Sequence, residues 1–140
     1  MAAPFTVVDS SVVVKWFLPE TSHERALVLL RRYREQSIRL LAPALLMVEV
    51  GNVFCKRVRR RELIESSAAQ AFQLLKINAP AIVDDQALLD DAMALALLGG
   101  QTVYDCLYLA LALRLECDLI TADRKFHSAM KTRYSNVTYL

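Results

Sequence analysis

Glycine is scarce in this sequence: its 140 residues include only three, Gly51, Gly99 and Gly100. The phosphate-binding loops Gly-x-x-x-x-Gly-Lys-(Ser/Thr) and Gly-x-Gly-x-x-Gly need two or three glycines at fixed spacing, and neither pattern occurs. The sequence therefore excludes both of these nucleotide-binding loops.

Cysteine and histidine patterns typical of zinc sites are also missing. Cys55, Cys106 and Cys117 form no Cys-x-x-Cys pair, and His23 and His127 do not complete a zinc motif. Three reduced thiols are typical of a cytoplasmic protein, so we expect a cytoplasmic location. The net charge is only +2, and any nucleic-acid binding must therefore depend on local basic patches.

Long apolar runs are absent too. The stretch from Tyr104 to Leu115 is broken by Asp105 and Arg114 and is too short to span a bilayer. The first residues lack the basic and apolar segments of a signal peptide. We therefore expect no membrane partner.

Hydrophobic residues make up 55% of the sequence, which is enough for a core in one domain over residues 1–140. Short apolar segments alternate with helical patterns, and this alternation predicts an α/β fold: a short parallel sheet of about five strands with helices on both faces. The expected strands are Phe5–Val8, Ile38–Leu41, Ala81–Val83, Leu119–Thr121 and Val137–Tyr139. The expected helices are Ser10–Phe17, a segment capped by Thr21 or Ser22 and ending near Glu35, Ala44–Arg60, Ser66–Lys76, Gln86–Leu98, Thr102–Leu115 and Lys125–Lys131.

Four acidic residues, Asp9, Glu49, Asp105 and Asp123, are embedded in apolar sequence. Asp9 and Asp123 follow strands, and ligands of parallel sheets bind beyond the carboxyl ends of strands. Asp105 is expected in the first turn of a helix capped by Thr102. If the fold gathers the four carboxylates, their repulsion is about 3 kcal/mol per pair at about 5 Å and an effective dielectric near 20. A hard divalent cation would remove this penalty.

Glu49 begins a polar helix face that continues through Asn52, Lys56 and Arg60, at spacings of three and four residues. This face becomes basic toward its end, which suits contact with phosphates. An ordinary solvated helix face gives the same pattern. Ser10, Ser11 and Thr121 place hydroxyls beside two of the acids, where they either orient a carboxylate or cap a turn.

Each acid also fits a plain structural role when it is taken alone. Asp9 and Asp123 suit strand-end turns or caps, and Asp105 suits a first-turn helix charge. Asp84 and Asp85 are rivals for the site because they also follow a strand, although Asp84 is expected to cap the next helix. The aromatic residues Trp16, Phe17, Tyr104 and Tyr108 could stack on bases, but their helical spacing is more typical of a core.

Two other phosphate-handling classes share an acid after the first strand, and neither fits. A haloacid-dehalogenase-like phosphatase needs a second Asp two residues later, where this sequence has Ser11. A response-regulator receiver needs an acidic pair before the strand-end acid, and the residues before Asp9 supply none.

Taken in order along the chain, these stretches resemble the PIN-domain family and, within it, the VapC-type toxins of toxin–antitoxin modules. The resemblance depends on Asp9-Ser10-Ser11-Val12, Lys15-Trp16-Phe17-Leu18-Pro19-Glu20, Pro43 with Glu49-x-x-Asn52, Thr102-x-Tyr104-Asp105-x-x-Tyr108-Leu109-Ala110, and Leu119-Ile120-Thr121-Ala122-Asp123. It places the family's acids on Asp9, Glu49, Asp105 and Asp123, and its accessory polar positions on Ser11, Asn52 and Thr121. It implies a PIN-like α/β/α fold and a ribonuclease dependent on Mg²⁺ or Mn²⁺, homodimeric and silenced by a cognate VapB-type antitoxin.

We therefore expect metal-assisted hydrolysis of RNA phosphodiesters. Asp9 and Asp105 would hold the principal metal, Glu49 and Asp123 would complete its shell or hold a second ion, and Lys56 and Arg60 would contact RNA phosphates. Two alternatives remain: a non-catalytic acidic pocket that docks a basic partner, and a PIN-like nuclease directed at DNA or flap structures.

Overall fold

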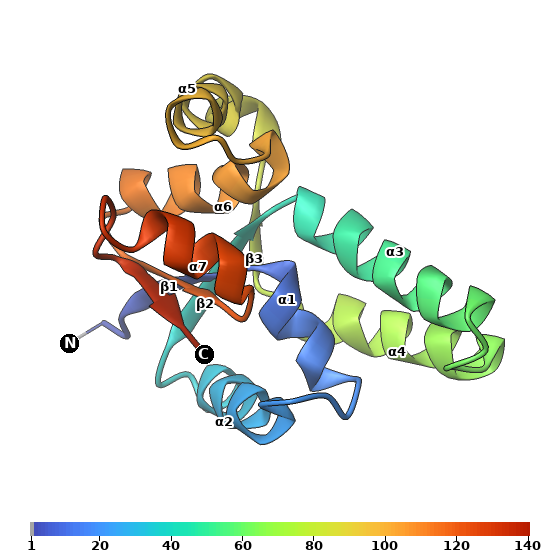
Figure 1. Cartoon of the computed structure of the whole chain (residues 1–140). Coiled ribbons are helices and arrows are strands. Elements are labelled where there is room, and N and C mark those ends of the chain that lie inside the picture. Colours follow the sequence, from blue (N-terminus) through green and yellow to red (C-terminus); the bar gives the residue numbers. More distant parts are fainter. Residues whose placement is uncertain (1) are drawn as a thin grey trace.

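A computed structural model describes residues 2–140, and its centre is a five-stranded, fully parallel sheet (Figure 1). The strands are β1 (Phe5–Val8), β2 (Arg39–Pro43), β3 (Ala81–Val83), β4 (Asp118–Thr121) and β5 (Val137–Tyr139). Their order in the sheet is β3-β2-β1-β4-β5. The chain thus builds the sheet outward from β1 in one direction, then returns to build it in the other. The order reverses between β1 and β4, and such a switch point opens a crevice at the carboxyl ends of the two strands.

Helices cover both faces of the sheet, which confirms the predicted three-layer α/β/α arrangement. They are α1 (Ser10–Val13), α2 (His23–Arg34), α3 (Leu45–Arg59), α4 (Glu65–Asn78), α5 (Leu89–Gly99), α6 (Val103–Arg114) and α7 (Arg124–Met130), with 3₁₀ turns η1 (Val14–Trp16) and η2 (Asp85–Leu88). In Figure 1, α6 and α7 lie on one side of the sheet, α2 lies on the other, and α5 packs outside α6.

Helix α6 is the central helix of the core. Its residues from Cys106 to Ala112 are all buried, because the sheet covers one side of the helix and α5 covers the other. A helix that is apolar all round belongs in such a position. Its first turn, which carries Asp105, reaches the edge of the core, and so do its last residues, Leu113 and Arg114.

Three predicted helix features differ from the structure. The segment Ser10–Phe17 is a four-residue helix followed by a 3₁₀ turn, and Pro19 prevents its continuation because proline has no amide donor. The segment Gln86–Leu98 likewise opens as the 3₁₀ turn η2 before α5 begins. Ser22 occupies the N-cap position of α2 without a side-chain cap, since its backbone is left-handed, with φ of 66°.

Gly99 marks a close approach between α5 and α7. A Cβ atom added at Gly99 would lie 3.1 Å from both Sδ and Cε of Met130, which is buried. The missing side chain therefore lets the end of α5 and the buried side of α7 pack together.

Within residues 2–140, no single helix is long and apolar enough to cross a membrane. The segments Asp85–Gly99 and Val103–Arg114 reach that length and hydropathy only as a pair, with a bend of 114° between them.

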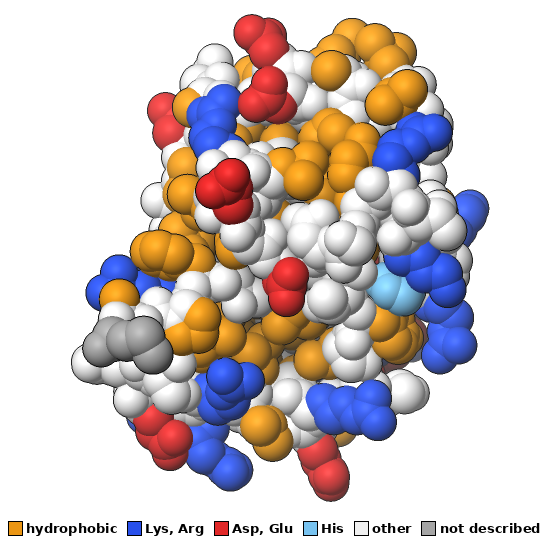
Figure 2. Space-filling view, turned by 90° about the vertical axis from the view of Figure 1, so that its left-hand side faces the viewer, with side chains coloured by type: hydrophobic (Ala, Val, Ile, Leu, Met, Phe, Trp, Pro, Cys, Tyr) orange, Lys and Arg blue, Asp and Glu red, His pale blue; other side chains and the backbone are white. Residues whose placement is uncertain are grey.

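Exposed apolar side chains are concentrated on α5. Met93, Leu97 and Leu98 are all exposed there. Figure 2 shows hydrophobic side chains over the upper part of one face, at the level that α5 occupies in Figure 1. An exposed cluster of this kind is typical of a surface that contacts another molecule.

Candidate active site

Asp9 follows β1 directly, at the strand-order reversal. It is the N-cap of α1, and its Oδ1 accepts hydrogen bonds from the backbone N–H of Ser11, at 3.1 Å, and from the Ser11 hydroxyl. Its own N–H donates to the carbonyl of Ile120 in β4, at 3.3 Å. These bonds hold the carboxylate in one orientation over the ends of β1 and β4.

Ser11 and the buried Thr121 connect the two strand ends. The hydroxyl oxygens of Ser11 and Thr121 lie 3.4 Å apart, and the Ser11 Oγ also accepts from the Ala122 N–H at 2.8 Å. The Thr121 Oγ1 accepts from the Asp123 N–H at 3.0 Å. The two hydroxyls therefore link Asp9 to the segment that carries Asp123.

Asp105 lies in the first turn of α6, where the Thr102 hydroxyl accepts its N–H at 3.1 Å. The cap and the position of Asp105 confirm the predicted helix start. Within residues 2–140, no hydrogen bond runs back from the Thr102 N–H to the Asp105 carboxylate, so only half of a capping box forms. The Thr102 side chain also acts as a hydrogen-bond partner of the Asp105 carboxyl and lowers its pKa, against the larger opposing effect of burial.

Glu49 is partly buried on α3, and two hydroxyls hold its Oε1. Tyr108 of α6 donates to it, and Ser10 of α1 donates at 3.3 Å. Tyr108 and Asp105 are three residues apart, so one face of α6 presents both groups. Of the two rivals of Glu49, Asp84 caps η2 as expected, whereas Asp85 accepts from the N–H of Leu45 at the start of α3.

Asp123 is the N-cap of α7, and its Oδ1 accepts the N–H of Phe126 at 3.0 Å. The structural reading of this residue as a cap is therefore correct. The cap uses one carboxylate oxygen. Within residues 2–140, no hydrogen bond reaches its second oxygen.

Electrostatic coupling joins the four acids. Burial raises the pKa of Asp9 to about 6, against the opposing effect of the Ser11 and Thr121 hydrogen bonds, and the charge of Asp105 raises it further. Burial likewise raises the pKa of Glu49, with contributions from Asp105 and Asp85. It raises the pKa of Asp105, with a contribution from Asp123. Asp9, Glu49 and Asp105 are thus costly to ionise because of burial and their acidic neighbours.

The donor set fits a hard cation that retains water. Within residues 2–140, no three His, Cys, Asp or Glu side chains lie close enough to enclose one ion. Mg²⁺ does not need such a cage, because it is commonly held by one or two carboxylates together with waters and substrate phosphates. Asp9 and Asp105 offer hard oxygen ligands of the right charge. The neighbouring thiol of Cys106 is no alternative ligand, since burial raises its pKa to about 11.

The remaining predicted site residues belong to the exposed side of α3 and to its C-terminal end. Asn52, Lys56 and Arg60 are all exposed, and within residues 2–140 no hydrogen bond or ion pair joins them to the four acids. Arg60 follows Glu49 by eleven residues, or roughly 16 Å along a helix. The accessory role of Asn52 and the contacts of Lys56 and Arg60 with RNA therefore stay predictions.

Tyr108 is the site residue that sequence reasoning missed. Its spacing along α6 suggested core packing, and the side chain is indeed buried. Its hydroxyl nevertheless reaches Glu49, 59 residues away in sequence. The only local signal was its i+3 relation to Asp105.

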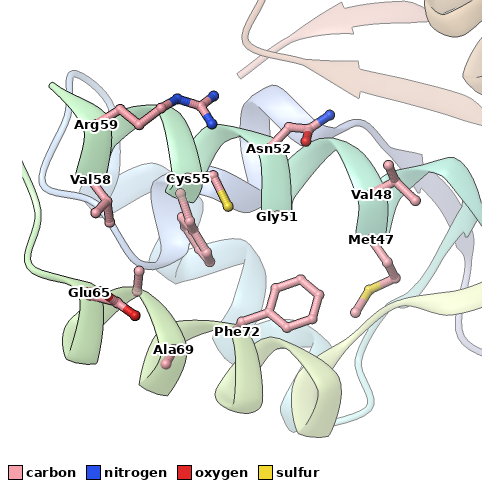
Figure 3. Close-up of a pocket in the computed structure, with 12 residues that line it drawn as sticks. Met47, Val48, Gly51, Asn52, Cys55, Val58, Arg59, Glu65, Ala69 and Phe72 are labelled. Atoms are coloured by element: carbon pink, nitrogen blue, oxygen red, sulfur yellow. The ribbon is translucent and has the colours of Figure 1, made fainter.

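A pocket of about 600 Å³ lies away from the acids, between α3 and α4 (Figure 3). Its lining is largely apolar and includes Met47, Phe54 and Phe72, and Asn52 lines it from the upper side of α3. Small-molecule sites usually combine an apolar pocket with convergent polar groups. Here the apolar pocket and the cluster of acids occur in different places, so we assign the catalytic role to the acids.

The fold and site together define a class: a parallel α/β protein with hydroxyl-bound carboxylates at the switch point of its sheet. The PIN domain family model matches residues 6–131, and the chain belongs to the PIN domain family. It is 36% identical to Ribonuclease VapC3 of Pyrobaculum aerophilum over 126 residues, covering 85% of this chain and 89% of that protein. This similarity confirms the resemblance to VapC-type proteins.

Solved structures give the same fold. PAE2754 from Pyrobaculum aerophilum superposes with a TM-score of 0.67 at 22% identity, covering 92% of this chain and 81% of that one. VapC20 from Mycobacterium tuberculosis, titled a sarcin-ricin loop cleaving toxin, gives 0.65 at 14% identity, covering 89% and 94%. VapBC2 from Rickettsia felis, solved with a DNA fragment from its promoter, gives 0.61 at 13% identity, covering 97% of each chain.

Proposed function

We propose that this protein is a metal-dependent endoribonuclease, the toxin of a VapBC-type toxin–antitoxin module. The observation that carries the proposal is the Asp9 carboxylate, whose pKa of about 6 reflects burial beside further acids at the switch point of the sheet. Such a group needs a cation to be ionised cheaply. Membership of the PIN family and the similarity to Ribonuclease VapC3 support RNA as the substrate.

Asp9 and Asp105 would hold Mg²⁺ or Mn²⁺, with Glu49 and Asp123 completing the shell or holding a second ion. A bound divalent ion supplies positive charge that polarises a phosphoryl oxygen. Ser11 and Thr121 fix the direction of the Asp9 carboxylate. Tyr108 and Ser10 do the same for Glu49.

Purified protein tests this proposal directly. Single-stranded RNA should be cut in the presence of Mg²⁺ and left intact in EDTA, and Asp9→Asn should be inactive with its fold retained. Sequencing of the RNA fragments would give the cleavage positions. Wild-type activity in Asp9→Asn would refute the assignment, and cutting of single-stranded or flap DNA with RNA left intact would favour the DNA-directed alternative.

A second candidate is a binding module without catalysis, in which a basic side chain neutralises the acids. The raised pKa of Asp9 favours any cation, and an arginine of a partner protein satisfies it as well as a metal does. This candidate predicts tight partner binding with no RNA turnover at any Mg²⁺ concentration. Isothermal calorimetry with Mg²⁺, run beside the cleavage assay, separates the two.

The proposal includes two protein partners in the cytoplasm. One is a VapB-type antitoxin, supported by the similarity in fold to a VapBC complex. The other is a second copy of this chain, for which the exposed apolar side chains of α5 offer surface. Light scattering of the purified chain, alone and with the product of a small neighbouring gene, measures both assemblies.

A further inference from the structure

A cluster of aromatic and basic side chains lies at the carboxyl end of β5. The guanidinium carbon of Arg124 lies 5.3 Å from the centroid of the Tyr139 ring, and the rings of Tyr139 and His127 lie 5.5 Å apart at 45°. The Tyr139 residue is 40% exposed, and Arg124 is exposed as well. We call these three residues the Tyr139 cluster.

The cluster borders the acidic site. Tyr139 pairs with Thr121 in the β4–β5 ladder, and neighbouring strands lie roughly 4.8 Å apart. Thr121 contacts Ser11, which holds Asp9. Arg124 comes directly after Asp123 in the sequence. The Tyr139 cluster is therefore one strand beyond the carboxylates, on the same edge of the sheet.

The positive charge of the cluster is available to a ligand. Within residues 2–140, no ion pair includes Arg124 or the exposed Lys125 that follows it. Arg25 adds a further cation nearby, through a 3.4 Å hydrogen bond to the carbonyl of Leu140. Positive charge beside a cluster of acids attracts a polyanion that the acids alone would repel.

We propose that the Tyr139 cluster binds a nucleotide of single-stranded RNA next to the phosphate that is cut. The base stacks on the Tyr139 ring, and Arg124 binds a phosphate of the same strand. Aromatic rings with neighbouring arginines bind single strands in this way with little sequence preference, because every base offers a flat face. This inference rests on the proposed function, from which it takes the identity of the substrate.

The opposite end of the sheet supplies a matched control. The guanidinium carbon of Arg39 lies 5.4 Å from the centroid of the Phe5 ring, and Phe5 is 43% exposed. The two residues begin neighbouring strands and pair in register. The pair therefore has nearly the same geometry and exposure as Arg124 and Tyr139 but lies at the amino end of the sheet, far from the acids.

The test measures binding in an Asp9→Asn background, which keeps RNA intact. The probes are a fluorescein-labelled oligoadenylate and an oligomer of equal length with abasic sites. Tyr139→Leu should weaken oligoadenylate binding about 10-fold by loss of stacking, and should leave binding of the abasic oligomer unchanged. Tyr139→Phe should restore binding. Arg124→Gln should weaken binding of both probes and lower the salt dependence of binding by about one phosphate contact. Phe5→Leu and Arg39→Gln should leave binding of both probes unchanged.

Other outcomes overturn the inference. Equal losses for both probes with Tyr139→Leu would mean a structural role, which a lower melting temperature would accompany. Failure of the background protein to bind oligoadenylate would also overturn it, since stacking tolerates any base. RNA cleavage by the wild type separates the two claims. If the wild type cleaves RNA and Tyr139→Leu binds oligoadenylate as tightly as its background protein, only the role of the Tyr139 cluster is rejected. If Tyr139→Leu loses binding as expected but the wild type cleaves no RNA, only the nuclease function is rejected.

Discussion

The two ends of the parallel sheet carry similar chemical groups in different surroundings. Asp118 begins β4 at the amino end and is exposed, whereas Asp9 follows β1 at the carboxyl end, where burial raises its pKa to about 6. The difference comes from the chain path, because at the carboxyl end the loops after β1 and β4 meet and bring Ser11 and Thr121 against the acid. Residue type alone therefore does not identify a site acid. Burial and the neighbouring hydroxyl groups distinguish Asp9 from Asp118.

The largest expected effect is the loss of cleavage in Asp9→Asn. The asparagine oxygen can keep the hydrogen bonds from Ser11, but the charge that we propose holds the metal is gone. We expect initial rates on labelled single-stranded RNA with Mg²⁺ to fall about 1,000-fold, because a bound metal contributes several kcal/mol to transition-state stabilisation. The same substitution at the amino end, Asp118→Asn, should leave the rate unchanged. Equal losses of cleavage rate in the two variants would show that the acids at the two ends of the sheet do not differ in function.

The next effect is on stability. The pKa of Asp9 is about 6 in the folded protein against 3.8 for an ordinary Asp. The folded state therefore holds an additional proton between these values, and stability falls as pH rises from about 4 to about 6. The loss is at most about 3 kcal/mol, since one pKa unit corresponds to about 1.4 kcal/mol.

Urea denaturation in EDTA at pH 4 and pH 7 measures this effect. The free energy of unfolding of Asp9→Asn should equal that of the wild type at pH 4 and exceed it at pH 7. Millimolar Mg²⁺ should raise the free energy of unfolding of the wild type at pH 7. A constant difference between the two proteins at both pH values would contradict the buried, ionisable Asp9.

Tyr108→Phe should have a smaller effect on activity. It removes the hydroxyl that orients Glu49 and leaves the ring in the core. Loss of such an orienting partner typically lowers activity 10–100-fold, and we expect a fall of about 10-fold in kcat/KM. Tyr104→Phe is the control, since Tyr104 is exposed on the same helix. If the two variants are equally active, the hydrogen bond to Glu49 has no role in the reaction.

The smallest effect should come from the basic end of α3. Lys56→Gln combined with Arg60→Gln should weaken RNA binding several-fold and lower its salt slope by about two phosphate contacts, without changing the cleavage positions. The control is Arg31→Gln combined with Arg34→Gln in the last turn of α2, which leads into the amino end of β2. Equal salt slopes in the two pairs would mean that the α3 face is merely solvated.

Much of the fold follows from local sequence. The strands at Phe5–Val8, Ala81–Val83 and Val137–Tyr139 have the predicted bounds, because short β-branched runs between polar breaks leave few alternatives. The start of α6 was equally clear from Thr102 and its cap. The 3₁₀ turns were not predicted, since their apolar residues fit either helix type and tertiary packing decides between them.

The site was predictable only in part. Local sequence pointed to four candidate acids and the family resemblance named the same four, but the hydroxyl partners of Glu49 come from residues 39 and 59 positions away. The tie from Asp85 to the N–H of Leu45 is equally long in sequence, at 40 residues. No local pattern encodes such contacts, because they arise only when separate helices pack against one another.

The close approach at Gly99 has a consequence for the rim of the site. Adding one methyl group there would crowd the thioether of Met130 and force α7 to shift or its methionine to change rotamer. The first residue of α7 is Arg124, directly after Asp123. A small replacement at the end of α5 would thus displace the helix that begins beside Asp123 only as far as the Met130 side chain does not yield.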